Sequence, residues 1–267
     1  FLIKGFFLVI RSGRFMESVY GIYCFLFHSP SYLVENSDFN LDETMILARE
    51  YYQEKRKVQN AIKILSRDLT KERELNFLFH GYIVTQEGFL IGEYAQNSAR
   101  IFVKNIDKIN VIDFYQKDPG VRHIHSILCS DTTLFISTGD SKKYLDQWEL
   151  IDDEIVFTKR ILNNFFGGFT GCSKVQNMHF FASDFSRRPN YIYCLETREK
   201  YFFPKPAYNQ VCSIMLPVKN RYIFCIFFDF HQVSVAIFDT QYFLFVYCQT
   251  HSANDEYFSK WPSISSL

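Results

Sequence analysis

The sequence Arg122-His123-Ile124-His125-Ser126-Ile127 is followed by the polar sequence Ser137-Thr138-Gly139-Asp140. The apolar, β-branched character of the first stretch favours a strand, whereas the second has the composition of a tight turn. Side chains alternate along a strand with a period of two, so both histidines are expected on the same side. We therefore predict a strand over residues 123–129 that presents two imidazoles on one face, and a hairpin turn over residues 138–141.

Short apolar or alternating stretches of this kind recur from about residue 77 onward, separated by turn-forming residues. This spacing is typical of all-β sandwiches, barrels and propellers. The expected strands cover residues 78–84, 89–93, 99–104, 123–129, 133–138, 147–151, 155–159, 179–183, 191–195, 211–217, 222–229, 233–239 and 243–249.

Tandem four-stranded meanders without intervening helices favour a β-propeller, whose blades take about 40 to 50 residues each. The 267 residues then suffice for five or six blades, or for an incomplete ring, in a single domain over residues 1–267. The exception is a short helix near residues 42–70, where apolar residues at 58, 62, 65 and 69 have helical spacing. An outer strand over residues 61–65 is the alternative there, and the assignment of residues 1–75 to the propeller is the least defined.

Composition narrows the class of partner and the compartment. Lys plus Arg and Asp plus Glu both number 29, so no net positive field attracts nucleic acid. The seven cysteines form no CxxC or CxxH pair, so neither a zinc site nor a disulfide framework is indicated, and a reducing compartment such as the cytoplasm is favoured. The apolar start FLIKGFFLVI is too short to span a bilayer; secretion remains open if an N-terminal signal has been removed.

Four sequence elements resemble those of sialidase-like β-propeller proteins, relatives of the BNR or Asp-box repeat proteins. They are Gly92-Glu93-Tyr94, His123-Ile124-His125-Ser126, Thr138-Gly139-Asp140, and Ala182-Ser183-Asp184 followed by Asn190-Tyr191-Ile192-Tyr193. The resemblance implies a propeller that acts on or binds a polysaccharide or oligosaccharide. The arginine triad of sialidases proper is not matched, so the resemblance does not imply sialidase activity.

The candidate site residues lie in these elements and beside them. Candidate catalytic residues, which carry imidazole, carboxylate or phenol groups suited to proton transfer, are His123, His125, Glu93, Tyr94 and Asp140. Candidate substrate-binding residues, which can donate or accept hydrogen bonds from sugar hydroxyls, are Arg100, Asn97, Arg122, Asp184 and Asn190. No dinucleotide or phosphate-binding motif is present, so no cofactor is expected, and no metal site is assigned.

Each of these groups also has a purely structural interpretation. The two histidines can be satisfied by neighbouring polar side chains, Glu93 can form an ordinary exposed salt bridge, and Asp140 or Asp184 can close an Asx turn. Two function classes therefore stay open. The chain is either a glycoside hydrolase or polysaccharide lyase, or a propeller that binds a glycan or a protein without turnover.

Overall fold

The computed structural model describes residues 53, 81–84, 88–94, 98–104, 109–117, 120–139, 142–151, 154–163, 168–185, 189–228 and 232–252. These residues form an all-β structure of four antiparallel sheets, each built from four strands that are consecutive in the sequence. The first sheet contains β1 (Tyr82–Val84), β2 (Phe89–Gly92), β3 (Ile101–Lys104) and β4 (Ile109–Ile112). The second contains β5 (His123–Ser130), β6 (Thr133–Gly139), β7 (Tyr144–Ile151) and β8 (Glu154–Asn163).

The third sheet contains β9 (Phe169–Val175), β10 (Met178–Ser183), β11 (Tyr191–Cys194) and β12 (Lys200–Phe202). The fourth contains β13 (Cys212–Val218), β14 (Tyr222–Phe228), β15 (Gln232–Asp239) and β16 (Leu244–Ser252). Two short 3-10 helices, η1 (Phe114–Lys117) and η2 (Ala207–Asn209), lie in the connections between the first and second and between the third and fourth sheets.

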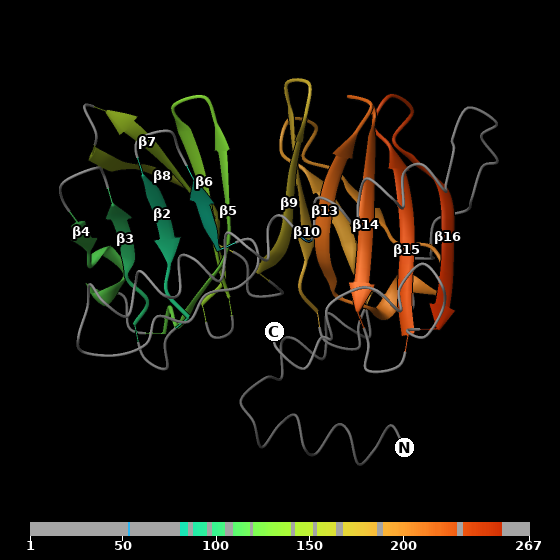
Figure 1. Cartoon of the computed structure of the whole chain (residues 1–267), viewed down its shortest axis with the longest axis horizontal. Helices are drawn as coiled ribbons and strands as arrows, with labels where there is room; N and C mark the ends of the chain where they lie inside the picture. The colour runs from blue at the N-terminus through green and yellow to red at the C-terminus, as the bar shows by residue number, and fades with distance from the viewer. Residues whose placement is uncertain are drawn as a thin grey trace, which may run out of the picture.

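The four sheets follow one another in space in the order of the sequence. The first strand of each sheet contacts the first strand of the next, because β1 lies against β5, β5 against β9 and β9 against β13. Figure 1 shows the first two sheets on the left and the last two on the right, and the space-filling view has the same sequence of colours. The strands that open each sheet therefore form the seams of the molecule, whereas the last strand of each sheet lies at its opposite edge: β4, β8, β12 and β16.

Apolar side chains fill the spaces between neighbouring sheets. Ile124, Ile127 and Trp148 of the second sheet pack against the first sheet, whereas Phe135 and Leu145 face the third sheet and pack with Phe169 and Phe181. Alternate residues of one strand thus serve two different interfaces, as the pleat requires. The near-continuous burial of β5 and β6 follows from this position between two other sheets.

Buried hydroxyl groups cross the same seams. Ser126 Oγ donates to the carbonyl oxygen of Phe169 at 2.9 Å, and the backbone N–H of Phe169 donates to Ser137 Oγ at 2.9 Å. Thr170 Oγ1 donates to the carbonyl oxygen of Cys212 at 2.9 Å. The inner strands cannot form a continuous backbone ladder with one another, so these side chains satisfy backbone groups that would otherwise be buried without partners.

The expected strands are largely confirmed, and His123–Ser130 forms the predicted strand around the two histidines. Three strands were not predicted: β4, β9 and β12. Within β9, Gly171 interrupts the apolar pattern that marks a strand, and β12 is only three residues long. The helix expected near residues 42–70 lies outside the described residues, apart from Gln53, which is helical. No helix in the part of the chain that the structure describes is long and apolar enough to cross a membrane.

Candidate functional site

The described candidate residues gather at one end of the first three sheets. In each of these sheets, this end carries the connection between the second and third strands and the start of the first strand. The backbone N–H of Ile124 donates to the carbonyl oxygen of Glu93 at 3.1 Å, which joins the β2–β3 connection to the start of β5. The β10–β11 connection reaches the same strand through Asp184, which contacts His125. Residues far apart in the sequence therefore meet around the start of β5.

A β-bulge shapes the start of β5. Ile124 pairs with Thr138 and Ser126 pairs with Ser137, so His125 is the extra residue without a partner in the ladder. A bulge increases the local twist and changes the direction of the side chains on the bulged strand. As a result His125 and the neighbouring Ser126 both contact the third sheet, through Asp184 and Phe169 respectively. Simple alternation places them on opposite faces.

Two glycines make room for the His125 ring. A Cβ atom on Gly139 would lie 1.9 Å from Cε1 and 2.0 Å from Nε2 of His125. A Cβ atom on Gly168 would lie 2.5 Å from the carbonyl oxygen of Thr138 and 3.3 Å from Nδ1 of His125. Both distances of about 2 Å to the ring are far below van der Waals contact, so the imidazole requires glycine at position 139.

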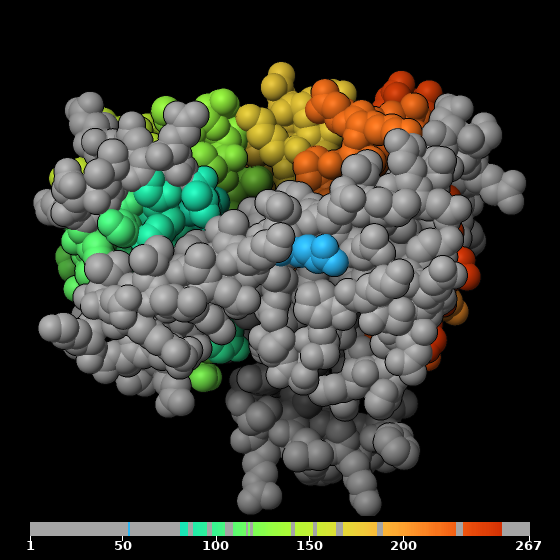
Figure 2. Space-filling model, viewed as in Figure 1, coloured from blue at the N-terminus to red at the C-terminus, as the bar shows by residue number. Residues whose placement is uncertain are grey.

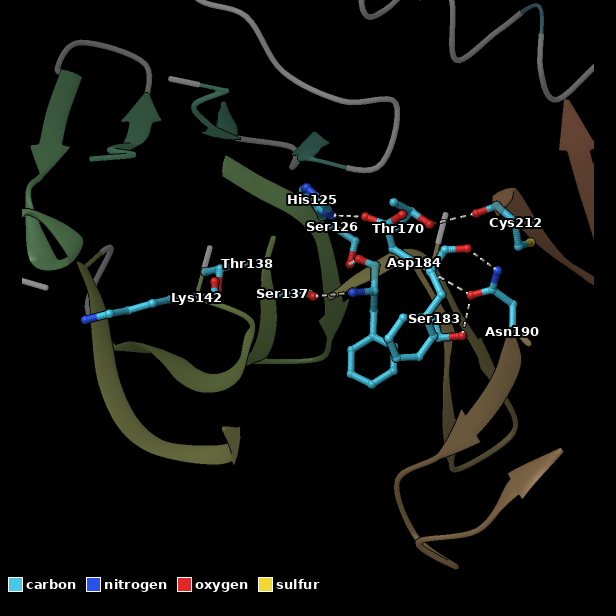
Figure 3. A network of polar contacts seen from close by, with 12 residues as sticks. His125, Ser126, Ser137, Thr138, Lys142, Thr170, Ser183, Asp184, Asn190 and Cys212 are labelled. Atoms are coloured by element: carbon cyan, nitrogen blue, oxygen red, sulfur yellow. Dashed lines mark hydrogen bonds and ion pairs between the residues drawn. The ribbon is translucent and has the colours of Figure 1, made fainter. Parts of the chain in front are cut away.

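His125 and Asp184 form the polar centre of this seam. Nδ1 of His125 lies 3.1 Å from Oδ2 of Asp184, and Figure 3 shows this contact beside the hydroxyl groups that cross the seam. The His125 side chain is buried, whereas that of Asp184 is 22% exposed. The backbone N–H of Asp184 donates to the carbonyl oxygen of Gly168 at 2.9 Å, which fixes the loop at the end of β10. The contact places a ring nitrogen of His125 beside a carboxylate oxygen of Asp184, and it ties the start of β5 to the end of β10.

His123 and Tyr94 form a second pair next to the first. The two residues are joined by an isolated antiparallel bridge, and their ring centroids lie 3.5 Å apart in an edge-to-face arrangement. The His123 and His125 ring centroids lie 6.1 Å apart. His123 is buried, whereas Tyr94 is 38% exposed. The pairs thus place two imidazoles, a phenol and a carboxylate together, with Tyr94 and Asp184 reaching the surface.

Glu93 and Arg100 form an ion pair at the base of the β2–β3 connection. Arg100 Nε lies 3.2 Å from Glu93 Oε2, and its NH2 group lies 3.2 Å from Oε1, so the contact is bidentate. The backbone N–H of Arg100 also donates to Oε2 at 3.1 Å. The structural interpretation of an exposed salt bridge is wrong in one respect, because Glu93 is only 2% exposed. The carboxylate is held by this loop and oriented toward Arg100.

Asn190 holds the β10–β11 loop. Its Oδ1 accepts from Ser183 Oγ and from the backbone N–H of Phe185, both at 2.8 Å. Its Nδ2 donates to the carbonyl oxygens of Phe185 and Gln210 at 2.7 and 2.9 Å. The amide is fully buried and supports the loop that carries Asp184.

The remaining candidates differ in how far the structure describes them. Arg122 immediately precedes His123 and is partly exposed. Asp140 and Asn97 lie outside the described residues. Thr138, which precedes the Gly139 position, accepts from the N–H of Tyr144 and donates to the carbonyl oxygen of Lys142, both at 2.9 Å. It fixes the β6–β7 connection beside the His125 ring.

The arrangement supports hydrogen bonding more directly than metal binding. Among the described residues, no three His, Cys, Asp or Glu side chains gather in a way that could hold a metal ion. Neutral imidazole offers one donor and one acceptor, and a carboxylate offers acceptors only. Sequence reasoning did not find the roles of Gly168 and Ser183. The adjacent pair Gly167-Gly168 was the available signal for the first, since paired glycines suggest a close approach of the backbone.

No protein-family model matches the sequence, and no curated protein matches it. Among solved structures, the chain is similar to an auxiliary nutrient binding protein from Bacteroides thetaiotaomicron, with a TM-score of 0.42 and 11% identity. That match covers 62% of this chain and 39% of the other. The chain is also similar to a chain in the S. cerevisiae complex of Dbp5 with Nup159, Gle1, IP6 and ADP, with a TM-score of 0.35 and 9% identity. The second match covers 68% of this chain and 49% of the other, so this chain spans less than half of either.

Proposed function

We propose that the four sheets are consecutive blades of a β-propeller. Two features support the proposal: every sheet is a four-stranded meander, and its first strand lies against the first strand of the next sheet. In a propeller the first strand of each blade lines the central axis, and the sheets follow one another around it. The end that carries the second-to-third-strand connections is then one face of the ring.

We infer that this face binds a carbohydrate without turnover. The observation that carries the inference is the meeting of the Tyr94–His123 and His125–Asp184 pairs at the start of β5. A partly exposed phenol ring offers a stacking surface for a pyranose, and the carboxylate of Asp184 can accept hydrogen bonds from sugar hydroxyls. The sequence resemblance to carbohydrate-active propellers points to the same ligand class.

The contacts of the carboxylates favour binding over catalysis. A general acid or base must reach the reacting group and exchange a proton with it. Glu93 is buried and oriented toward Arg100 by a bidentate contact, and Asp184 is directed toward His125. Each of these carboxylates is therefore oriented toward a side chain of the protein. The alternative is hydrolysis with Glu93 or Asp140 as acid/base, or elimination in which His123 or His125 and Tyr94 remove a proton.

We also propose that the protein works in a reducing compartment. The six cysteines in the described part of the chain, Cys129, Cys172, Cys194, Cys212, Cys225 and Cys248, are all free. Free thiols in this number persist where the surroundings keep them reduced.

The test compares two exposed tyrosines at opposite ends of the sheets. Tyr94 lies at the proposed binding face, whereas Tyr242, 61% exposed, lies in the β15–β16 turn at the other end. Purified protein is screened on a glycan array, and the affinity for the best glycan is measured by calorimetry. Tyr94→Ala is expected to weaken binding about two- to twelvefold, because an aromatic contact contributes roughly 0.5–1.5 kcal/mol. Tyr242→Ala is expected to leave the affinity unchanged.

Three results would overturn the proposal. Failure to bind any neutral or uronate-containing glycan excludes the carbohydrate ligand. Release of reducing ends or of unsaturated products from a polysaccharide excludes binding without turnover and favours the enzyme alternative. Equal loss of affinity in the two tyrosine variants assigns the ligand to another surface.

A further inference from the structure

The fourth sheet, which ends the row of sheets at the right of Figure 1, has an apolar face that points away from the third sheet. Its nine side chains come from alternate positions of β13, β14 and β15, and none is more than 8% exposed. They are Ile214, Leu216, Val218, Tyr222, Phe224, Ile226, Val233, Val235 and Ile237. The intervening residues, such as Cys225 and Phe238, pack with Phe180 and Ile192 of the third sheet. Both faces of this sheet are therefore buried, and the nine residues form what we call the outer face.

The strand registers show that the outer face is continuous across the sheet. Leu216 pairs with Phe224, and Phe224 pairs with Ile237. Ile237 pairs in turn with Tyr247, which is half-buried on the edge strand β16. Paired residues of neighbouring strands point to the same side of a sheet. This row of side chains therefore spans all four strands, a width of about 14 Å at roughly 4.8 Å between strands.

No described residue of another sheet covers the outer face. The apolar side chains of this cluster, including the partly buried Val246 and Tyr247, all belong to the fourth sheet. Beyond their own sheet, the main contacts of β13 to β16 among the described elements are with the third sheet and η2, on the opposite side. One sheet does not shield its own face from water, because its side chains stand next to one another. The described part of the chain therefore does not account for the burial of this face.

The first sheet has a similar face at the other end of the row. Tyr82, Ile91 and Phe102 pair in register and are at most 3% exposed. They lie opposite to Leu90, which packs against the second sheet. Among the described residues, this cluster contains side chains of the first sheet alone. Each end of the row thus buries a face that no other described sheet covers, as expected if the row closes into a ring.

Few other segments of the chain are long enough to cover four strands. Between residues 81 and 252, the gaps in the described part are two to four residues long. Residues 253–267 include three charged side chains in a short stretch, and charged side chains are rarely buried without partners. Length and composition therefore favour the part of the chain that precedes residue 81.

Residues 18–34 are the segment whose composition suits a buried face. Ser18 to Val34 is the longest stretch of the chain without Asp, Glu, Lys or Arg, and Glu17 and Glu35 bound it. It includes the sequence Val19-Tyr20-Gly21-Ile22-Tyr23-Cys24-Phe25-Leu26-Phe27. A nearly continuous apolar sequence is typical of a segment that is buried on two sides. Such a segment suits a position between two sheets.

We propose that residues 18–34 pack on the outer face of the fourth sheet and so close the row of sheets. The occupant is the chain itself, because the face is already buried within a single chain. A second copy or a separate protein would find the face covered. The closure of a ring rests on the proposed propeller, whereas the packing of this segment rests on the burial of the face alone.

Photo-cross-linking of the whole chain tests this contact. Tyr247→p-benzoylphenylalanine places a photoreactive ring at the half-buried edge of the outer face, and Tyr222→p-benzoylphenylalanine places one on β14. After irradiation, trypsin digestion and mass spectrometry identify the linked peptides. Residues 15–49 form one tryptic peptide and residues 222–260 another, because no Lys or Arg interrupts them. We expect these two peptides to be linked in both variants.

Phe243→p-benzoylphenylalanine is the matched control on the opposite side of the sheet. Phe243 is half-buried like Tyr247, and its ring stacks on that of Tyr201 in the third sheet at a centroid distance of 5.4 Å. This variant is expected to link to residues 201–219, the tryptic peptide that contains Tyr201. Circular dichroism on each variant checks that the fold is kept.

The proposal is overturned if the control links to residues 201–219 but neither outer-face variant links to residues 15–49. It is also overturned if the outer-face variants link instead to another part of the chain, or to a second copy seen as a dimer on a denaturing gel. The glycan affinity of the Tyr247 variant is expected to equal that of the unchanged protein, because the candidate carbohydrate site lies in the first three sheets. A failed cross-link and a failed glycan screen are therefore distinguishable.

Discussion

Replacing Gly139 by Ala tests whether the structure places the His125 ring correctly. The added methyl group would lie about 2 Å from two ring atoms of His125, so the ring must move and the contact with Asp184 must lengthen. Overpacking of a buried site costs about 1–3 kcal/mol, and loss of the contact between a buried ring and a partly exposed carboxylate costs about 1–3 kcal/mol, less than the breaking of a fully buried pair. The smaller entropy of the unfolded Ala chain offsets about 0.4–1 kcal/mol. We expect a net loss of about 3 kcal/mol.

Thermal and urea unfolding, followed by circular dichroism, measure this loss. At about 2–4 °C per kcal/mol for a chain of this size, the midpoint temperature should fall by about 6–12 °C. Gly171→Ala is the control substitution in another seam. Its Cβ atom would meet the flexible side chain of Met215 at 2.9 Å, so a smaller loss of about 1 kcal/mol is expected.

A double-mutant cycle with His125→Ala separates the ring from other causes. Without the ring, the methyl group at position 139 has space, so Gly139→Ala should cost at least about 1 kcal/mol less in that background. If the cost of Gly139→Ala is the same with and without the imidazole, the ring does not lie on Gly139. The geometry of the site would then be refuted, together with the inference that builds on it.

Two further predictions concern polar groups that form hydrogen bonds with other side chains. Asp146 is fully buried and accepts hydrogen bonds from Arg160 Nε at 2.9 Å and from the Tyr115 hydroxyl at 3.0 Å. Asp146→Asn should lower the free energy of unfolding in urea by about 3 kcal/mol, which is the lower end of the range for a broken buried pair because Arg160 is 30% exposed. A loss below about 1 kcal/mol contradicts the contact. Burial, and then the hydrogen bond to Glu199, raise the pKa of Tyr201 to about 12. A pKa raised by folding contributes stability that is complete below about pH 10, the unfolded value, and is lost as the pH rises toward 12. Tyr201→Phe should therefore reduce the fall in the free energy of unfolding between pH 10 and 12, and an unchanged pH profile would show that this phenol does not contribute.

The pattern of apolar residues predicted most of the strands, because most of the strands bury one or both of their faces. The strand around His123 was predicted from its apolar, β-branched neighbours, and β14 and β15 from continuous apolar sequence. β9 was missed because it contains Gly171 and polar residues, and it owes its position to contacts with β5 and β13 on either side. Such contacts are long-range, so no local pattern in the sequence reports them.

The contacts among the candidate residues were harder to predict than the residues themselves. His125 was a candidate catalytic residue and Asp184 a candidate substrate-binding residue, and the sequence did not predict that the two side chains meet. The bulge that turns His125 toward the third sheet was not predicted, because a bulge is defined by the partner strand and not by the bulged strand alone. The burial of Glu93 was not predicted for a similar reason. Its exposure depends on the sheets that pack around the β2–β3 connection.

The contacts along the seam between β5 and β9 show which features the fold needs and which features only the His125–Asp184 pair needs. Farther along β5 and β9, the thiol of Cys172 lies 3.6 Å from the carbonyl oxygen of Ile127, and the other contacts across this seam are apolar. A buried imidazole next to a carboxylate rarely contributes more stability than well-packed apolar residues of similar size, because both groups lose hydration. The fold therefore gains little from His125 and Asp184, while the bulge and the glycine at position 139 are needed to accommodate the ring. The fold alone does not require this polar pair at the exposed end of the seam, which supports our proposal that a ligand contacts it.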